Sequence, residues 1–248
     1  MPRNVRAIGG RVCLGAGILA ATYGASVKPV GASAPVAGAA GRTTAAAKAS
    51  LSRSGWSQFS DQTVDLKVLD LALRAAACAT RAGLVDDPTT LTLIDYSRRS
   101  SDRRLWVFDL QSGRVLHHEL VAHGQGTGGD LATAFSNRPD SHQSSLGLFV
   151  TADTYVGNNG YSLRLDGLDP GFNDRARERA IVMHGAPYVS DDFVRAQGRL
   201  GRSWGCPALG DDVARTVIDS IKGGNLVFAY YPDQAWLNGS RLLADCQS

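Results

Sequence analysis

A histidine and a cysteine lie at the two ends of one predicted loop, and together they are the residues best suited to nucleophilic catalysis. His184 ends a short apolar run, residues 180–183, that is typical of a buried strand. The polar residues 189–201 then predict a surface loop, after which the chain returns to Cys206. Because the entropy cost of closing a loop grows slowly with its length, the two side chains can meet. An imidazole that takes or pairs with the thiol proton makes Cys206 a nucleophile.

The residues around Cys206 favour catalysis over packing. Gly201, Ser203, Gly205 and Pro207 are small or turn-forming residues, which fill a core poorly but expose backbone. Gly205 permits a close approach of substrate, and the N–H groups of Gly205 and Cys206 are candidates for an oxyanion hole. The alternative interpretation is a buried structural cysteine and a core histidine.

These residues resemble the signature of L,D-transpeptidases with a YkuD-type catalytic domain: His-Gly, a spacer, then Ser/Thr-His-Gly-Cys. The similarity is closer to murein L,D-transpeptidase catalytic domain proteins, and it extends roughly over residues 91–232. Its motifs occur here in the same order, at residues 136–137, 144–147, 162–168, 184–186 and 201–208. The chain departs from the wider family at Trp204, where a second histidine is usual. It departs again at Pro207-Ala208, which replaces an apolar residue and an arginine.

The resemblance implies a mainly β fold with peripheral helices, a β-sandwich-like catalytic domain. It also implies two-step acyl transfer on peptidoglycan stem peptides, without a cofactor. The thiolate attacks the carbonyl of the third stem residue, the terminal D-Ala leaves, and an amine resolves the thioester into a 3-3 cross-link. The acceptor amine is left open between a second stem, a lipoprotein lysine and a free D-amino acid.

Two other function classes are kept as alternatives. Water in place of the amine makes the protein an L,D-carboxypeptidase or an amide hydrolase of the cell wall. A non-catalytic peptidoglycan-binding module could use the same cleft, but a pure binder has no need of a thiol beside an imidazole.

The motifs supply further candidate residues. Ser203 is expected to orient the histidine or the loop, and is assigned with Cys206 and His184 to the catalytic group. Trp204 is expected to cover the site or to contact sugar or peptide. Gly185, Asn137 and Arg202 belong to the matching motifs and are assigned to substrate binding on that ground.

His123 and Arg164 are candidates of a weaker kind. His123-Gly124 repeats the His-Gly pair, which indicates a substrate contact or a second ligand. Zinc held by His123, His184 and Cys206 is disfavoured, because no short ligand spacing accompanies them, so no metal is expected. Arg164 lies between apolar strand residues. It either holds a substrate carboxylate with two hydrogen bonds or pairs with an aspartate of the fold.

The first residues of the chain are typical of an export signal, predicted at 1–39. Arg3, Arg6 and Arg11 precede a short apolar stretch, residues 12–21, which is too short to span a bilayer. The alternative is a disordered Ala/Gly-rich tail. The predicted location is therefore the periplasm or cell envelope, and no transmembrane segment is expected. Because the net charge of +3 comes largely from this segment, nucleic acid is not an expected partner.

Residues 40–57 are rich in small and polar residues and predict a flexible linker, followed by a catalytic domain at 58–248. An oxidising compartment would permit a disulfide between Cys78 and Cys246, with two free thiols as the alternative. The pattern predicts a first helix over 61–82, capped by Ser60 or Asp61, and a late helix over 211–221 capped by Asp211. Strands are predicted at 91–96, 105–110, 115–121, 147–151, 161–165, 180–184 and 226–231, with a hairpin turn at Ser112-Gly113.

Overall fold

The computed structural model describes residues 63–244. The predicted export signal and linker, and also Cys246, lie outside the described residues. The first described helix, α2 (Leu66–Arg81), begins later than the predicted residue 61. The side chain of Asp65 caps it by accepting a hydrogen bond from the Lys67 N–H at 2.8 Å. Gly83, with φ of +69°, follows the helix end as predicted.

Eight strands form one sheet. Seven of them match the predicted apolar runs to within a few residues at most ends, whereas the two-residue strand Ala208–Leu209 was not predicted. The eight strands are β1 (Thr90–Asp95), β2 (Leu105–Asp109), β3 (Val115–Glu119), β4 (Gly147–Gly157), β5 (Gly160–Gly167), β6 (Val182–Gly185), β7 (Ala208–Leu209) and β8 (Leu226–Tyr230). The order across the sheet is β3-β2-β1-β8-β4-β5-β6-β7. The predicted hairpin joins β2 to β3, with Gly113 at φ of +71°. The mainly β fold with peripheral helices is therefore confirmed.

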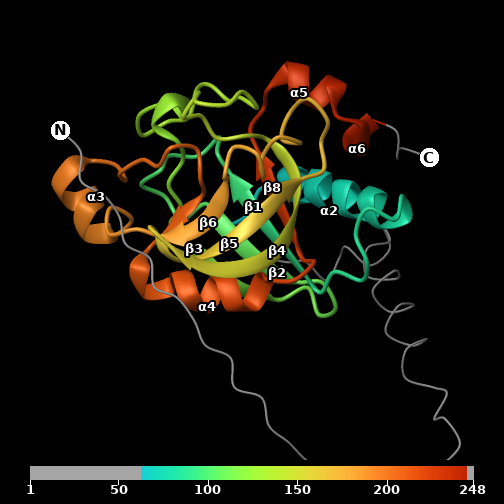
Figure 1. The fold of residues 1–248 in the computed structure, drawn as a ribbon, viewed down its shortest axis with the longest axis horizontal. Helices are drawn as coiled ribbons and strands as arrows, with labels where there is room; N and C mark the ends of the chain where they lie inside the picture. The colour runs from blue at the N-terminus through green and yellow to red at the C-terminus, as the bar shows by residue number, and fades with distance from the viewer. Residues whose placement is uncertain (1–62, 245–248) are drawn as a thin grey trace, which may run out of the picture. The chain divides into compact units, whose positions relative to one another are not determined.

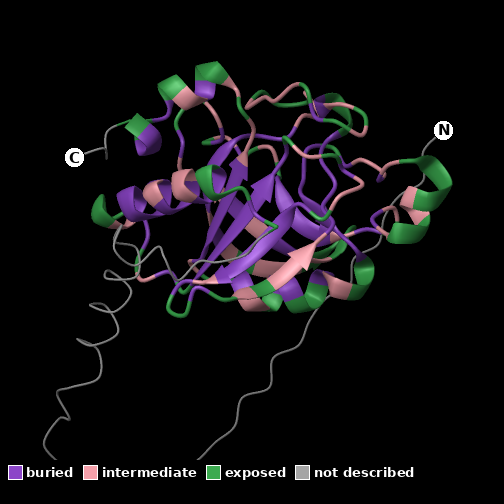
Figure 2. Ribbon diagram, turned by 180° about the vertical axis from the view of Figure 1, so that it is seen from behind, coloured by how far each residue is buried: buried purple, intermediate pink, exposed green. Residues whose placement is uncertain are grey.

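The two ends of this sheet come together. Ala122, shortly after β3, forms an antiparallel bridge with Ala208 of β7, and the two hydrogen bonds measure 2.9 and 3.4 Å. The sheet therefore curves back on itself around a core of apolar side chains. Figure 1 shows the strands at the centre of the molecule, and Figure 2 shows that most of their residues are buried.

Helices cover the outside of the sheet. Helix α2 packs on β1, β4 and β8, whereas α4 (Asp211–Ile221) packs on β1, β5 and β6 (Figure 1). The predicted range of α4 is confirmed, but Gly210 rather than Asp211 occupies its N-cap. Among the described residues, no helix combines the length and apolar character needed to cross a bilayer.

Three short helices were not predicted. Helix α3 (Asp191–Gln197) interrupts the expected polar loop, and the Ser190 side chain caps it by accepting from the Phe193 N–H at 3.1 Å. None of its residues is buried, so it lacks the apolar spacing that reveals a helix in a sequence. Helices α5 (Gln234–Gly239) and α6 (Arg241–Ala244) are too short to show a period.

Candidate active site

His184 lies on β6, and Cys206 lies two residues before β7, the neighbouring strand at one end of the sheet order. Strands β6 and β7 are parallel, and His184 pairs with Ala208, two residues beyond Cys206. The Cys206 Sγ lies against the backbone two residues before His184, accepting from the Val182 N–H at 3.4 Å. It also donates to the Ala180 carbonyl at 3.7 Å. Strand pairing therefore brings together the two residues that the sequence separates by a loop.

The orientation of the His184 ring leaves one nitrogen available as a base. Its Nδ1 lies 2.7 Å from the Gly185 carbonyl oxygen, which can only accept, so Nδ1 carries the proton. In the neutral ring, Nε2 then has a free lone pair. Within residues 63–244 the hydrogen bonds of the Cys206 Sγ go to the backbone and not to His184. Proton transfer therefore requires the two groups to approach each other.

Burial keeps both groups uncharged at rest. Cys206 is 9% exposed and His184 is 5% exposed. Desolvation raises the pKa of the Cys206 thiol above its usual value, although the Val182 N–H and Arg179 oppose this shift. Desolvation also lowers the pKa of His184, although the Gly185 hydrogen bond and the negative charge of Asp211 act to raise it. The resting pair is therefore a neutral thiol and a neutral imidazole, not an ion pair.

Ser203 shapes the turn that carries the thiol. Its hydroxyl donates to the Cys206 carbonyl at 2.6 Å and accepts from the Gly205 N–H at 3.1 Å. Ser203 was expected to orient the histidine or the loop, and these contacts fit the loop. The Gly205 N–H, predicted as an oxyanion donor, already has an acceptor, so the Cys206 N–H is the remaining candidate.

Gly205 is required at its position by its backbone and by its neighbours. Its φ is +120°, and a Cβ there would lie 2.8 Å from the Gln143 carbonyl oxygen. The Ser144 hydroxyl donates to the Gly205 carbonyl at 3.0 Å and accepts from the Gly124 N–H at 3.0 Å. Ser144 therefore links the turn at Gly205 to the backbone of Gly124 and has a structural role.

His123 is buried and does not face a substrate. Its Nδ1 accepts from the Arg104 guanidinium at 2.8 Å, and its Nε2 donates to the Gly128 carbonyl at 3.4 Å. Burial, with Arg104 beside it, lowers the pKa of His123 to about 4. The predicted substrate contact is therefore wrong, and the zinc alternative has no free nitrogen on this ring. In the described part of the chain, no three His, Cys, Asp or Glu side chains form a metal-binding group.

Three other predicted substrate contacts are already engaged within the protein. Arg164 pairs with Asp153 at 3.1 Å, which is the second of its two predicted roles. The Asn137 side chain donates to Asp174 at 2.7 Å. Arg202 donates to the Gly128 carbonyl at 2.9 Å. These contacts hold the fold and its loops, and the substrate roles of Asn137 and Arg202 stay predictions.

Trp204 and Gly185 remain open to the roles predicted for them. Trp204 is 72% exposed and stacks on His142, with ring centroids 5.0 Å apart. This pair forms an aromatic surface two residues from Cys206. A Cβ on Gly185 would lie 2.7 Å from the Asp211 carboxylate, so Gly185 keeps the start of α4 close to His184.

Two charged residues of the site were not predicted. Arg104 is fully buried at the start of β2 and donates to the Val121 and Arg98 carbonyls as well as to His123. Its only sequence signal is a basic residue directly before an apolar strand. Arg179 lies three residues before β6 begins, inside a charged run that is typical of a solvated turn.

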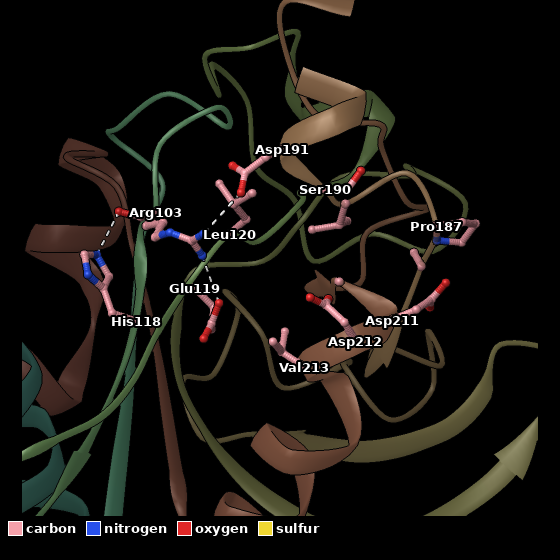
Figure 3. A pocket seen from close by; sticks show the side chains of 13 residues that line it. Arg103, His118, Glu119, Leu120, Pro187, Ser190, Asp191, Asp211, Asp212 and Val213 are labelled. Atoms are coloured by element: carbon pink, nitrogen blue, oxygen red, sulfur yellow. Dashed lines mark hydrogen bonds and ion pairs between the residues drawn. The ribbon is translucent and has the colours of Figure 1, made fainter. Parts of the chain in front are cut away.

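A cavity lies beside the site rather than in it. It has a volume of about 540 Å³ and is lined from β3, α3 and α4, including Arg103, Glu119, Asp191 and Asp211. Figure 3 shows Arg103 between Glu119 and Asp191, at 3.0 and 3.3 Å. Neither Cys206 nor His184 lines it.

Cys78 lies in α2, is buried and takes part in a disulfide. Because Cys246 lies outside the described residues, the predicted Cys78–Cys246 pairing stays a prediction. Cys206 is a free thiol.

Comparisons with known proteins identify the family. No curated protein matches the chain. An L,D-transpeptidase from Mycobacterium smegmatis is 16% identical, with 58% of this chain and 59% of that chain covered and a TM-score of 0.36. The cell shape determining protein Pgp2 from Campylobacter jejuni is 13% identical, with 60% and 50% covered and a TM-score of 0.40. The chain thus spans between half and three fifths of these structures. The family model described as L,D-transpeptidase catalytic domain matches residues 60–230. Since this match extends over more than half of the sequence, the chain belongs to the YkuD-type family of L,D-transpeptidase catalytic domains.

Proposed function

We propose that this protein is a peptidoglycan L,D-transpeptidase that works through a thioacyl-enzyme on Cys206. One observation carries the proposal. The free Cys206 thiol lies two residues before β7, the strand that pairs with His184, and the His184 Nδ1–H is held by the Gly185 carbonyl so that Nε2 is a base. Membership of the family supplies the substrate class, the tetrapeptide stem.

In the acylation step, His184 Nε2 takes the thiol proton as the sulfur attacks the carbonyl of the third stem residue. The oxyanion of the tetrahedral intermediate lies near the Cys206 N–H. The C–N bond to the terminal D-Ala then breaks, and His184 returns the proton to the departing amine. The enzyme is left with a thioester between Cys206 and the stem.

In the second step, an acceptor amine attacks this thioester and His184 takes a proton from it. The sulfur leaves and recovers the proton, and an amide joins the two stems. The acceptor is an amine of a second stem, or an equivalent amine such as a lipoprotein lysine. Such a reaction requires export, so we also propose that the protein works in the periplasm or cell envelope.

The purified full chain, incubated with disaccharide-tetrapeptide and analysed by mass spectrometry, tests the proposal. A dimer that lacks one D-Ala is the expected product. A tripeptide alone would replace transpeptidation with the L,D-carboxypeptidase alternative. Cys206→Ser should abolish turnover while the melting temperature stays close to that of the wild type. Turnover retained in Cys206→Ser would refute the cysteine mechanism, and an inert wild type would favour the wall-binding alternative.

A further inference from the structure

The guanidinium of Arg179 binds four acceptors within residues 136–145, and we call this set of hydrogen bonds the Arg179 clasp. It donates to the carbonyls of Ser136 and Gln143, at 2.7 and 2.6 Å. It also donates to the hydroxyls of Ser145 and Ser141, at 2.5 and 3.2 Å. All four acceptors are neutral. In the described part of the chain, no carboxylate pairs with this half-buried cation.

The segment that follows Arg179 wraps around the sulfur of Cys206. The Ala180 carbonyl accepts from the thiol and the Val182 N–H donates to it. Ala180 holds a φ of +52°, which a residue with a Cβ rarely adopts. On the other side, a Cβ built on Gly205 would lie 3.4 Å from an Arg179 Nη atom. The clasp and the thiol are therefore parts of one rigid arrangement.

Three titratable side chains interact electrostatically with this thiol: Arg179, Tyr96 and Tyr188. Burial raises the pKa of Tyr96 and of Tyr188 to about 12, so both phenols are neutral. Burial lowers the pKa of His184, which is neutral until it accepts the thiol proton. Arg179 is thus the permanent cation of this set, because a guanidinium stays protonated in proteins.

We propose that Arg179 is a positioning residue for the reaction: it ties residues 136–145 beneath the turn at 203–206 and supplies the fixed positive charge that stabilises the Cys206 thiolate. This inference rests on the proposed function for its chemical purpose. A cation left without a carboxylate in a half-buried place is costly unless an anion forms near it. The thiolate is that anion, and it forms only when the proton leaves.

The test measures the thiol itself, in the absence of peptidoglycan. The rate of iodoacetamide alkylation at Cys206 is followed from about pH 6 to about pH 11, by mass spectrometry of the peptide that contains it. The variants are Arg179→Met, which removes the charge, and Arg179→Lys, which keeps the charge but loses the planar set of N–H donors of the guanidinium. Arg175→Met is the matched control, because Arg175 is an exposed arginine of the same segment paired with Glu178.

In Arg179→Met the midpoint of the alkylation profile should rise by about one pH unit, so that the rate near pH 8 falls about tenfold. Arg179→Lys should keep the wild-type midpoint but melt at a lower temperature, and Arg175→Met should change neither. If both Arg179 variants keep the wild-type midpoint, or both shift it equally, the charge has no role and the proposal is overturned.

A double variant covers the case in which Arg179→Met does not fold. Ser141→Ala with Ser145→Ala removes two acceptors of the clasp and leaves the charge. Its midpoint should stay at the wild-type value, and a shift of a full unit would contradict the proposal. Because no substrate is used, failure of this inference is separate from failure of the proposed transpeptidase reaction.

Discussion

Replacement of Ser203 by alanine separates a positioning role from a catalytic one. The hydroxyl is buried and has two backbone partners, the Cys206 carbonyl at 2.6 Å and the Gly205 N–H at 3.1 Å. Alanine fits the same space but leaves both backbone groups without a partner. The turn that carries the thiol then loses the two contacts that fix its shape.

The expected loss can be worked from these two bonds. An unpaired buried polar group costs about 1–3 kcal/mol, and partial relaxation of the turn brings the pair to about 2–4 kcal/mol. For a chain of this size, each kcal/mol lowers the melting temperature by about 2–4 °C, so a fall of about 5–15 °C is expected. A displaced thiol should also lower turnover of the tetrapeptide by about 10–100-fold.

The assay combines thermal unfolding, followed by circular dichroism, with turnover measured by mass spectrometry. Ser162→Ala is the matched control, because Ser162 is a buried serine paired with His184 across β5 and β6, and its hydroxyl has one local partner. That variant should lose only about 1 kcal/mol. A Ser203→Ala protein that melts within about 2 °C of the wild type and yet loses more than about 1,000-fold in turnover would refute the positioning role.

Further predictions concern the surroundings of the thiol. His123 has a pKa of about 4 in the fold, and in the unfolded chain it binds a proton near pH 6.5. The free energy of unfolding should therefore fall by about 3 kcal/mol as the pH drops from about 6.5 to about 4. Urea unfolding of His123→Gln should lack this loss. Ala180→Gly should keep its stability within about 0.5 kcal/mol, whereas Ala180→Val should lose more than about 1 kcal/mol in the same assay, because φ is positive there. Acylation of the enzyme by a carbapenem should rise with pH along a limb below about pH 6.5, because His184 must be neutral to act as a base. Asp211→Asn should move that limb lower, since the carboxylate raises the pKa of His184. Trp204→Ala should leave the melting temperature unchanged and raise KM for the disaccharide-tetrapeptide more than it lowers kcat.

The parts of the fold that could be predicted are those whose residues repeat with a clear period. The apolar runs that became β1, β2 and β8 alternate or lie fully buried, and the heptad-like face of α4 points at the sheet. Helix α3 could not be predicted in this way, because no side chain of it is buried. Its ends are set by a serine cap and a glycine, signals that also occur in loops.

The site was predictable at its chemical centre and not around it. Cys206 and His184 are rare residues in a turn-rich setting, so their types alone draw attention. Arg104 and Arg179 belong to a chain with 26 basic residues, and nothing in a charged run marks which arginine turns inward. The role predicted for His123 was wrong for a related reason: a motif identifies the residue and does not show which atoms contact it.

Burial of the thiol changes what its reactivity can reveal about function. Desolvation raises the pKa of Cys206 and lowers that of His184, so both shifts oppose formation of an ion pair in the empty site. A slow reaction with a small electrophile is therefore expected of a working enzyme, and does not by itself indicate a binding module. Near neutral pH the free thiolate should be scarce, so attack on a bound carbonyl should be coupled to transfer of the thiol proton to Nε2. Acylation by a substrate or a carbapenem, rather than alkylation, is consequently the measurement that distinguishes an enzyme from a binder.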